Sequence, residues 1–493
     1  MKSNIYIHCL LLVVFLFIAG NIQANTHSSD QDRAYIASKI KFVYVPYPNS
    51  KNQTTETLDN HNIQAGKTTE KFWEDTYNPG AHNLVKALLL SPSNGGDQQL
   101  QYMVTRILKI RDKPVLIYLL NDHNLELLPK VADVFGGSVK DGKAWASGNN
   151  MEKLDAFSKA MVKCEGAASK AVPLAFAGYM TLGTTYLNEN QTSKTYTSFV
   201  HELGHTQDRH VKSDLSFYIG NESFIYGKDG SHWISEIIPS RAHAYHEGLA
   251  NAFSYLYRHQ RFNAQYDWFK DNGALRVELV YVDRNAQPSA DAVCMGATRP
   301  SQNIWIYEEI KNQNISESQS RKSYSNPATD YAFFSLQDLP PQYLVHNETI
   351  VALTVYSYVK LTSFSRFSYI VSSANEQIAR RQHDAPLSEL LDAMGRSHLN
   401  KGESLDDIFF HQAKPTTPQK YMLPLALIDY YTGYNAKNQD DLIKMAGYHA
   451  NMQKWLILYW PHRETIRKGI NLEKLAFSDV DIIAENVGVK LGQ

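Results

Sequence analysis

The sequence predicts an α+β fold, with strands and helices mixed in its first part and helices dominating its last part. Residues 40–46, IKFVYVP, alternate and are rich in β-branched and aromatic residues, which predicts a strand. Residues 113–120, KPVLIYLL, predict a second, buried strand. From residue 348 onward, apolar residues recur with a helical period through most of the chain.

The N-terminal region is expected to form an α/β domain over residues 25–150. Between its two strands, residues 69–90 read as helical on both sides of an Asn-Pro-Gly break, because proline and glycine interrupt helices. Residues 98–110 predict an amphipathic helix, whose apolar face consists of Leu100, Met103, Val104, Ile107 and Leu108.

A second domain is expected over residues 151–310. It begins with a predicted helix at 151–163, followed by a strand with a polar exit at 178–191. Two further helices are predicted at 193–210 and 240–260. The polar, serine-rich residues 311–330 are interpreted as a linker or long loop, and residues 331–493 as a mostly helical C-terminal domain.

Residues 1–24 have the pattern of a secretory signal peptide. Lys2 precedes the mostly apolar residues 5–19, and Ala24 is a plausible cleavage point. An uncleaved anchor is the alternative, although the apolar run is short for a span of roughly 20 residues. No later stretch reads as a membrane helix, so we expect a secreted or periplasmic protein without stable membrane insertion after cleavage.

The composition narrows the chemistry. The chain has 49 Lys and Arg against 50 Asp and Glu, and this balance favours neither nucleic acid nor an anionic membrane as a partner. Signal cleavage would leave Cys164 and Cys294, which could pair in an oxidising compartment or remain buried thiols. So few cysteines exclude a thiolate-based zinc site, so any metal must be bound by imidazole and carboxylate.

Residues 201–205, HELGH, carry the pattern H-E-x-x-H on a predicted helix. Residues four apart lie on one helix face, about 6 Å apart, so His201 and His205 can both point at one ion. Glu202 lies on the flank of that face and can reach a metal-bound water as a general base. The alternative is an ordinary solvated helix face, but the apolar setting of this helix favours a buried site.

A tetrahedral catalytic site needs a third protein ligand. The extended pattern H-E-x-x-H-x-x-G-x-x-H fails, because it needs glycine at position 208 and histidine at position 211, where the chain has Asp208 and Val211. Glu247, in HEGLANAF on the next predicted helix, is the favoured ligand. Its rivals are Glu236, His243 and His246.

Several residues near Glu247 are interpreted as supporting groups. Asn251 lies one turn further on the same face and could fix a ligating imidazole by a hydrogen bond. His243 lies one turn before Glu247 and could donate to the oxyanion of a tetrahedral intermediate. The rival donors for that role are Tyr226, Tyr245, Tyr255 and Tyr257.

HELGH, followed tens of residues later by EGLANAF on another helix, resembles the gluzincins, the thermolysin-like zinc metallopeptidases. The resemblance covers roughly residues 179–260 and neither flank. It implies a zincin-like core, consisting of an edge-stranded sheet, the H-E-x-x-H helix and the third-ligand helix. It also implies that zinc is held by His201, His205 and Glu247, with Glu202 as the base. Asn251 departs from the family, which often has an acidic residue there.

The resemblance implies an exported metallopeptidase. Zinc-activated water would attack the peptide carbonyl while Glu202 takes its proton and passes it to the leaving amine. A peptide or protein substrate would lie extended along the predicted edge strand at 184–190. Two alternatives remain: a zinc hydrolase of a non-protein amide or ester in the cell envelope, and a non-catalytic binding protein that keeps the zinc scaffold.

Overall fold

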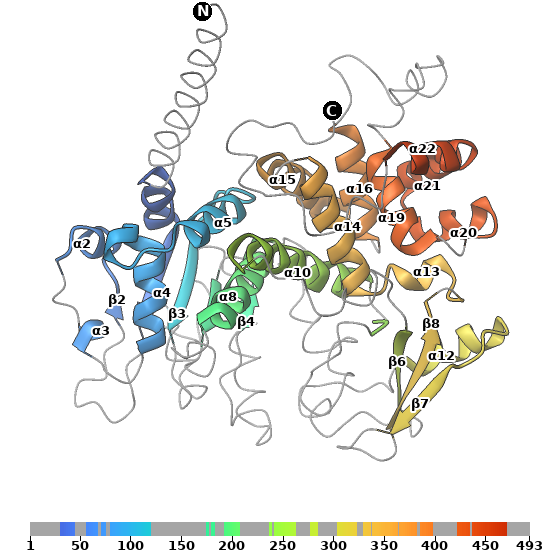
Figure 1. The fold of residues 1–493 in the computed structure, drawn as a ribbon, viewed down its shortest axis with the longest axis horizontal. Helices are drawn as coiled ribbons and strands as arrows, with labels where there is room; N and C mark the ends of the chain where they lie inside the picture. Colours follow the sequence, from blue (N-terminus) through green and yellow to red (C-terminus); the bar gives the residue numbers. More distant parts are fainter. Residues whose placement is uncertain are drawn as a thin grey trace, which may run out of the picture.

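The structure is a computed structural model of the 493-residue chain. It describes residues 30–44, 56–67, 71–74, 79–119, 174–176, 179–182, 192–207, 236–238, 241–262, 277–283, 303–322, 329–336, 338–362, 364–381, 385–397, 422–433 and 436–470. These residues form a mostly helical α+β protein with two small sheets (Figure 1).

The first sheet follows a helical segment at residues 30–39. Its strands are β1 (Ile40–Tyr44), β2 (Glu56–Thr57), β3 (Val115–Leu119), β4 (Leu174–Phe176) and β5 (Tyr179–Leu182), in the order β2-β1-β3-β5-β4. The inner strands β1, β3 and β5 are parallel, whereas the two edge strands are antiparallel to their neighbours. The two strands predicted near residues 40 and 115 are therefore confirmed. The sheet also continues across the expected domain boundary at residue 150.

Short helices accompany this sheet. They are α2 (Asn60–Gln64), α3 (Lys71–Glu74), α4 (Pro79–Leu89), the 3₁₀ turn η1 (Pro92–Asn94) and α5 (Gln98–Leu108). Asp97 begins α5, because its carboxylate accepts the amide hydrogens of Gln99 and Leu100. All five residues of the predicted apolar face of α5 are buried, which confirms that prediction.

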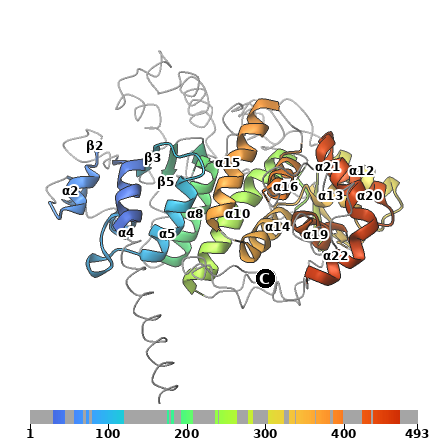
Figure 2. The ribbon, with the colours of Figure 1, turned by 90° about the horizontal axis from the view of Figure 1, so that it is seen from above.

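Two long helices occupy the middle of the molecule, α8 (Thr192–Gln207) and α10 (Arg241–Phe262). Both helices were predicted, with ends within three residues of those observed. Phe199, Val200 and Leu203 of α8 are buried, so this helix turns one apolar face into the core. In both views, α10 lies between α8 and the C-terminal helices (Figure 2).

A second sheet corrects the interpretation of residues 311–330 as a linker. It consists of β6 (Val277–Asp283), β7 (Gln319–Lys322) and β8 (Thr329–Ser335), in the antiparallel order β6-β8-β7, with α12 (Asn303–Asn312) beside it. The sequence of β7, QSRK, is polar because this edge strand is largely exposed. Central strand β8 buries Ala332 and Phe334, which alternate as a half-buried strand requires.

The remaining described residues are helical, as predicted. The helices are α13 (Pro341–Leu344), α14 (Glu348–Leu361), α15 (Phe364–Arg381), α16 (Pro386–Arg396), α19 (Leu423–Thr432), α20 (Gln439–Ile443), η10 (Lys444–Ala446), α21 (Ala450–Tyr459), η11 (Trp460–His462) and α22 (Arg463–Ile470). Residues 347–359 are all buried, because α14 packs between α10 and α19. One hydrophobic core joins most of these helices to α8, α10 and the first sheet, whereas the buried residues of α13 pack in a separate core with the second sheet.

Several predictions lie outside the described residues. They concern the signal peptide at 1–24, the helix at 151–163, the edge strand at 184–190, and the cysteines Cys164 and Cys294. Among the helices that the structure describes, none is long and apolar enough to cross a bilayer.

Candidate metal centre

Helix α8 carries both histidines of the H-E-x-x-H motif, and its end is held from two sides. The guanidinium of Arg111, which follows α5, donates to the carbonyl of Thr206 at 2.7 Å. The amide of Asn375 on α15 donates to the carbonyl of Gln207 at 3.0 Å. These donors satisfy carbonyls that a helix end leaves without partners. The turn that carries His205 is thereby fixed against two other elements.

Small residues bring α8 and α10 close together. A Cβ atom added to Gly204 would lie 3.1 Å from the Cα of Ala250 and 2.8 Å from a ring carbon of Phe253. Glycine therefore allows the helix backbones to approach at this point. The approach places Glu247 of α10 opposite the two histidines of α8.

The three predicted ligands converge on one point. The Nε2 atoms of His201 and His205 are 3.0 Å apart, and each lies 3.3 Å from Oε2 of Glu247. Ligand atoms held about 2.0–2.1 Å from a tetrahedral zinc ion would lie about 3.3 Å from one another. The observed triangle therefore fits a divalent cation with three protein ligands. The side chains of His201 and Glu247 are 21% and 14% exposed, so the group is not completely buried.

Burial and neighbouring charges shift the pKa values of the two histidines in opposite directions. Burial lowers the pKa of His201, but its hydrogen bond to Glu247 and nearby carboxylates outweigh burial and raise that pKa to about 9. Burial lowers the pKa of His205 to about 3. The pKa of Glu247 lies well below its usual value, because both imidazoles outweigh the opposing effect of burial. The two histidines therefore differ in their electrostatic surroundings, although they share one helix face.

Glu202, the predicted base, lies half-buried beside the triangle. Burial raises the pKa of its carboxyl to about 8, with His201 opposing and Glu247 reinforcing the rise. His205 is 95% buried, and its Nδ1 atom has no hydrogen-bond partner among the described residues. Buried titratable residues with strongly shifted pKa values, such as these, are typical of functional sites.

The rival third ligands are placed differently. The ring of His246 stacks on that of His205, with centroids 3.9 Å apart and planes 29° from parallel. A ring nitrogen binds a metal in the plane of its ring, so two stacked rings cannot both point at the same ion. Glu236 is buried but is not a member of the described three-residue group.

The predicted oxyanion donors find less support. His243 belongs to α10, but its side chain lies outside the described part of the structure, as does Tyr226. Tyr245, Tyr255 and Tyr257 are at most 3% exposed, which is typical of packing residues.

Asn251 has a partner that the sequence did not reveal. Its amide Nδ2 donates to Oε2 of Glu348 at 2.7 Å, and both side chains are buried. Glu348 is the first residue of α14, 97 residues further along the chain. Its sequence context, NETIVAL, marks only a helix start, so no local signal connects it with the metal ligands.

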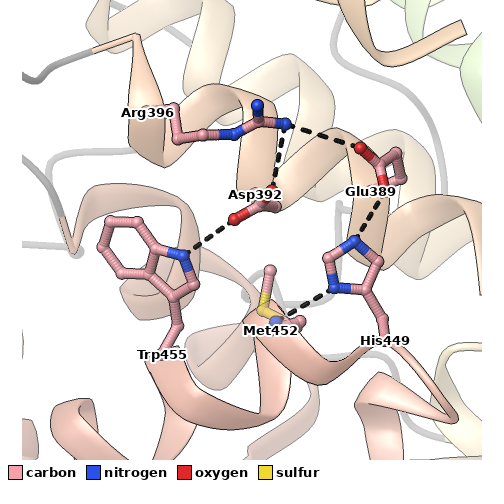
Figure 3. A network of polar contacts seen from close by, with 6 residues as sticks. All are labelled: Glu389, Asp392, Arg396, His449, Met452 and Trp455. Atoms are coloured by element: carbon pink, nitrogen blue, oxygen red, sulfur yellow. Dashed lines mark hydrogen bonds and ion pairs between the residues drawn. The ribbon is translucent and has the colours of Figure 1, made fainter. Parts of the chain in front are cut away.

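A second buried group, Glu389, Asp392 and His449, also has metal-like ligand types, but it is a closed hydrogen-bond network (Figure 3). Nδ1 of His449 accepts the amide hydrogen of Met452 at 3.0 Å, so the proton of the neutral ring is on Nε2. This Nε2 donates to Glu389 at 2.6 Å. A protonated nitrogen cannot bind a metal, so the network is structural.

The carboxylates of this network are paired as well. Arg396 lies 3.0 Å from Asp392 and 3.4 Å from Glu389, and the indole of Trp455 donates to Asp392 at 2.8 Å. These contacts join α16 to α21 and to the loop before it (Figure 3).

Comparison with known proteins gives no relative: no family model, no curated protein and no solved structure matches the chain.

Proposed function

We propose that the protein is an exported zinc metallopeptidase with a zincin-like catalytic core. The observation that supports this most strongly is the triangle of His201, His205 and Glu247, whose edges of 3.0, 3.3 and 3.3 Å fit tetrahedral zinc. Further support comes from the close packing of α8 on α10 and from the adjacent first sheet. The proposed export rests on the signal-like residues 1–24.

The side chains have separate roles in this proposal. His201, His205 and Glu247 hold the metal, and the partly exposed edge of the triangle leaves a position for water and substrate. Bound zinc supplies Lewis-acid polarisation of a carbonyl and acidifies water. Glu202 accepts a proton from the attacking water and returns it to the leaving amine. Arg111 and Asn375 keep the ligand-bearing turn of α8 in place.

Metal content and turnover of the purified full chain test the proposal. Wild-type protein should contain about one zinc ion per chain, and Glu247→Ala should contain almost none. Glu202→Gln should keep the zinc and lose hydrolysis of casein by about 10²- to 10⁴-fold. Glu308→Gln, an exposed change on α12, is the matched control and should behave like the wild type.

The same experiment separates the alternatives. Unchanged zinc in Glu247→Ala rejects the third ligand, and hydrolysis by Glu202→Gln at the wild-type rate rejects the base. Hydrolysis of cell-wall fragments but not casein identifies the envelope amide or ester hydrolase instead. Zinc without turnover on either substrate identifies the non-catalytic binding protein.

A further inference from the structure

A buried carboxylate, that of Glu348, lies on a helix other than α8 and α10, the two helices that carry the candidate metal ligands. Glu348 begins α14 and is 1% exposed. Its Oε2 accepts a hydrogen bond from Nδ2 of Asn251, which lies one turn after Glu247 on α10. The two residues therefore connect α14 to the helix that carries the third ligand.

Close packing fixes the start of α14 against the ligand helix. A Cβ atom added to Gly248 would lie 2.8 Å from the carbonyl oxygen of Glu348 and 2.5 Å from the Cβ of Val351. Only glycine at position 248, next to Glu247, leaves room for the α14 backbone. The first residue of α14 therefore packs against Gly248, the residue that follows the third ligand in the sequence.

Asn347 holds the same end of α14 in a second way. Its Oδ1 atom caps the helix by accepting the amide hydrogen of Ile350 at 3.0 Å, and its Nδ2 atom donates to the carbonyl of Glu236 at 3.3 Å. A carboxylate in the first turn is also favoured by the positive end of the helix dipole. The position of Glu348 is thus determined by several independent contacts.

The hydrogen bond places the carboxylate of Glu348 against the ligand helix. Its partner Asn251 lies four residues after Glu247, on the same face of α10, so the carboxylate is held one helical turn from the third ligand. Carboxylates behind metal-binding residues orient those ligands and strengthen the binding of a cation. Asn251 has no charge of its own, so any negative charge of this hydrogen-bonded pair is that of Glu348.

We propose that Glu348, acting through Asn251, is a positioning residue of the metal centre: it orients the third-ligand helix and supplies the negative charge that favours a divalent cation there. This inference rests on the proposed zinc function. Glu348 itself is not a ligand, because the group of ligand atoms consists of His201, His205 and Glu247.

Zinc affinity of the full chain, measured by competition with a chelator, tests the proposal without any assay of activity. Glu348→Gln keeps an oxygen that accepts the Asn251 hydrogen bond, removes the charge and replaces the other carboxylate oxygen with an NH2 group. We expect its Kd for zinc to rise about ten- to a hundredfold. Glu389→Gln is the matched control, a buried glutamate in the separate network of Figure 3, and should keep the wild-type Kd.

A charge-swap variant separates electrostatics from packing. Asn251→Asp combined with Glu348→Gln moves the carboxylate to α10 and the amide to α14, and keeps a hydrogen bond between them. A zinc Kd of the double variant close to that of the wild type supports the proposal. This comparison can be made even if the single variant Glu348→Gln fails to fold. A folded swap variant that binds zinc no better than Glu348→Gln overturns the proposal.

Two other outcomes separate the role of Glu348 from the proposed zinc function on which it rests. A folded Glu348→Gln protein with the wild-type Kd overturns the role of Glu348 and leaves the zinc centre intact. A wild-type chain that binds no zinc overturns both proposals.

Discussion

At the residue scale, the distance between two residues along the chain determines whether their meeting in the candidate site can be predicted from the sequence. His201 and His205 share a helix face because they are four residues apart, so their convergence needs no tertiary information. Glu247 lies on a separate helix, and its place in HEGLANAF and the resemblance to the gluzincins favoured it over its rivals. Glu348 lies on a third helix, 97 residues beyond Asn251, and its hydrogen bond to Asn251 depends entirely on how α14 packs.

Asp112 provides a test of pH dependence at this scale. It adopts a left-handed conformation with φ 52°, accepts the hydroxyl hydrogen of Tyr35 at 2.6 Å and pairs with Lys39 at 2.9 Å. The hydrogen bond from Lys39, followed by that from Tyr35, lowers the pKa of Asp112. A carboxyl whose pKa is lower in the folded state stabilises the fold above its unfolded pKa of about 3.9, and this contribution is lost as the pH falls.

We therefore expect Asp112→Asn to lower the free energy of unfolding slightly at pH 6 and to have less effect at pH 3. Asparagine tolerates the left-handed conformation, so the change isolates the charge from the backbone. Urea unfolding across this pH range measures the difference, with the exposed Asp338→Asn as the control. A difference that grows as the pH falls would contradict the prediction.

His449 provides a second test, because both of its ring nitrogens are engaged. His449→Ala removes the cap of α21 and a hydrogen bond to the buried Glu389, which should cost about 2 to 4 kcal/mol of unfolding free energy. The number of zinc ions per chain should not change. Chemical denaturation and metal analysis check the two parts, and a lost zinc ion would mean that this network binds metal.

At the scale of elements, the sequence predicted the first sheet better than the second. The amphipathic face of α5 and the two inner strands β1 and β3 were predicted within a few residues. The sheet of β6, β7 and β8 was missed. Its edge strand β7, QSRK, is as polar as a loop, but β6, VELVYVD, has the composition of a strand and was not predicted either. Pairing with β8 supplies the hydrogen bonds that make β7 a strand, and pairing partners cannot be read from composition.

The close contact between α10 and α14 at Gly248 predicts that a larger residue at this position destabilises the protein. Alanine at position 248 gains about 1 kcal/mol of helix propensity but forces a methyl group into the backbone of α14, which costs about 1 to 3 kcal/mol. We expect Gly248→Ala to be destabilised on balance. Gly395→Ala on α16 is the matched control, since its nearest contact is the edge of the Trp455 ring at 3.1 Å. Denaturant unfolding of both variants measures the comparison, and equal effects would contradict it.

At the scale of the whole molecule, the helices that carry the candidate metal ligands are part of the largest hydrophobic core described. The same core includes residues of the first sheet, of α8 and α10, and of the C-terminal helices. We expected domain boundaries at residues 150 and 310. The first sheet includes strands from both sides of residue 150, and α14 packs on α10 across residue 310. Such long-range packing is invisible in local periodicity.

Zinc should therefore stabilise the entire fold. A ligand that binds only the folded state adds about 2.7 kcal/mol at a free concentration of 100 times its Kd. We expect added zinc to raise the Tm of the wild-type chain and a chelator to reverse the rise. Glu247→Ala is the control and should show no response. Calorimetry checks this, and an equal rise in the variant would place the bound zinc elsewhere.

The burial of α14 against α10 also limits how the protein can be dissected. A truncated chain that ends before residue 331 would keep all three ligands but strip the cover from the apolar back of α10. Such a fragment would aggregate rather than report on the chemistry. Transplanting the H-E-x-x-H segment into another scaffold would fail for the same reason unless an equivalent of α14 were transferred with it.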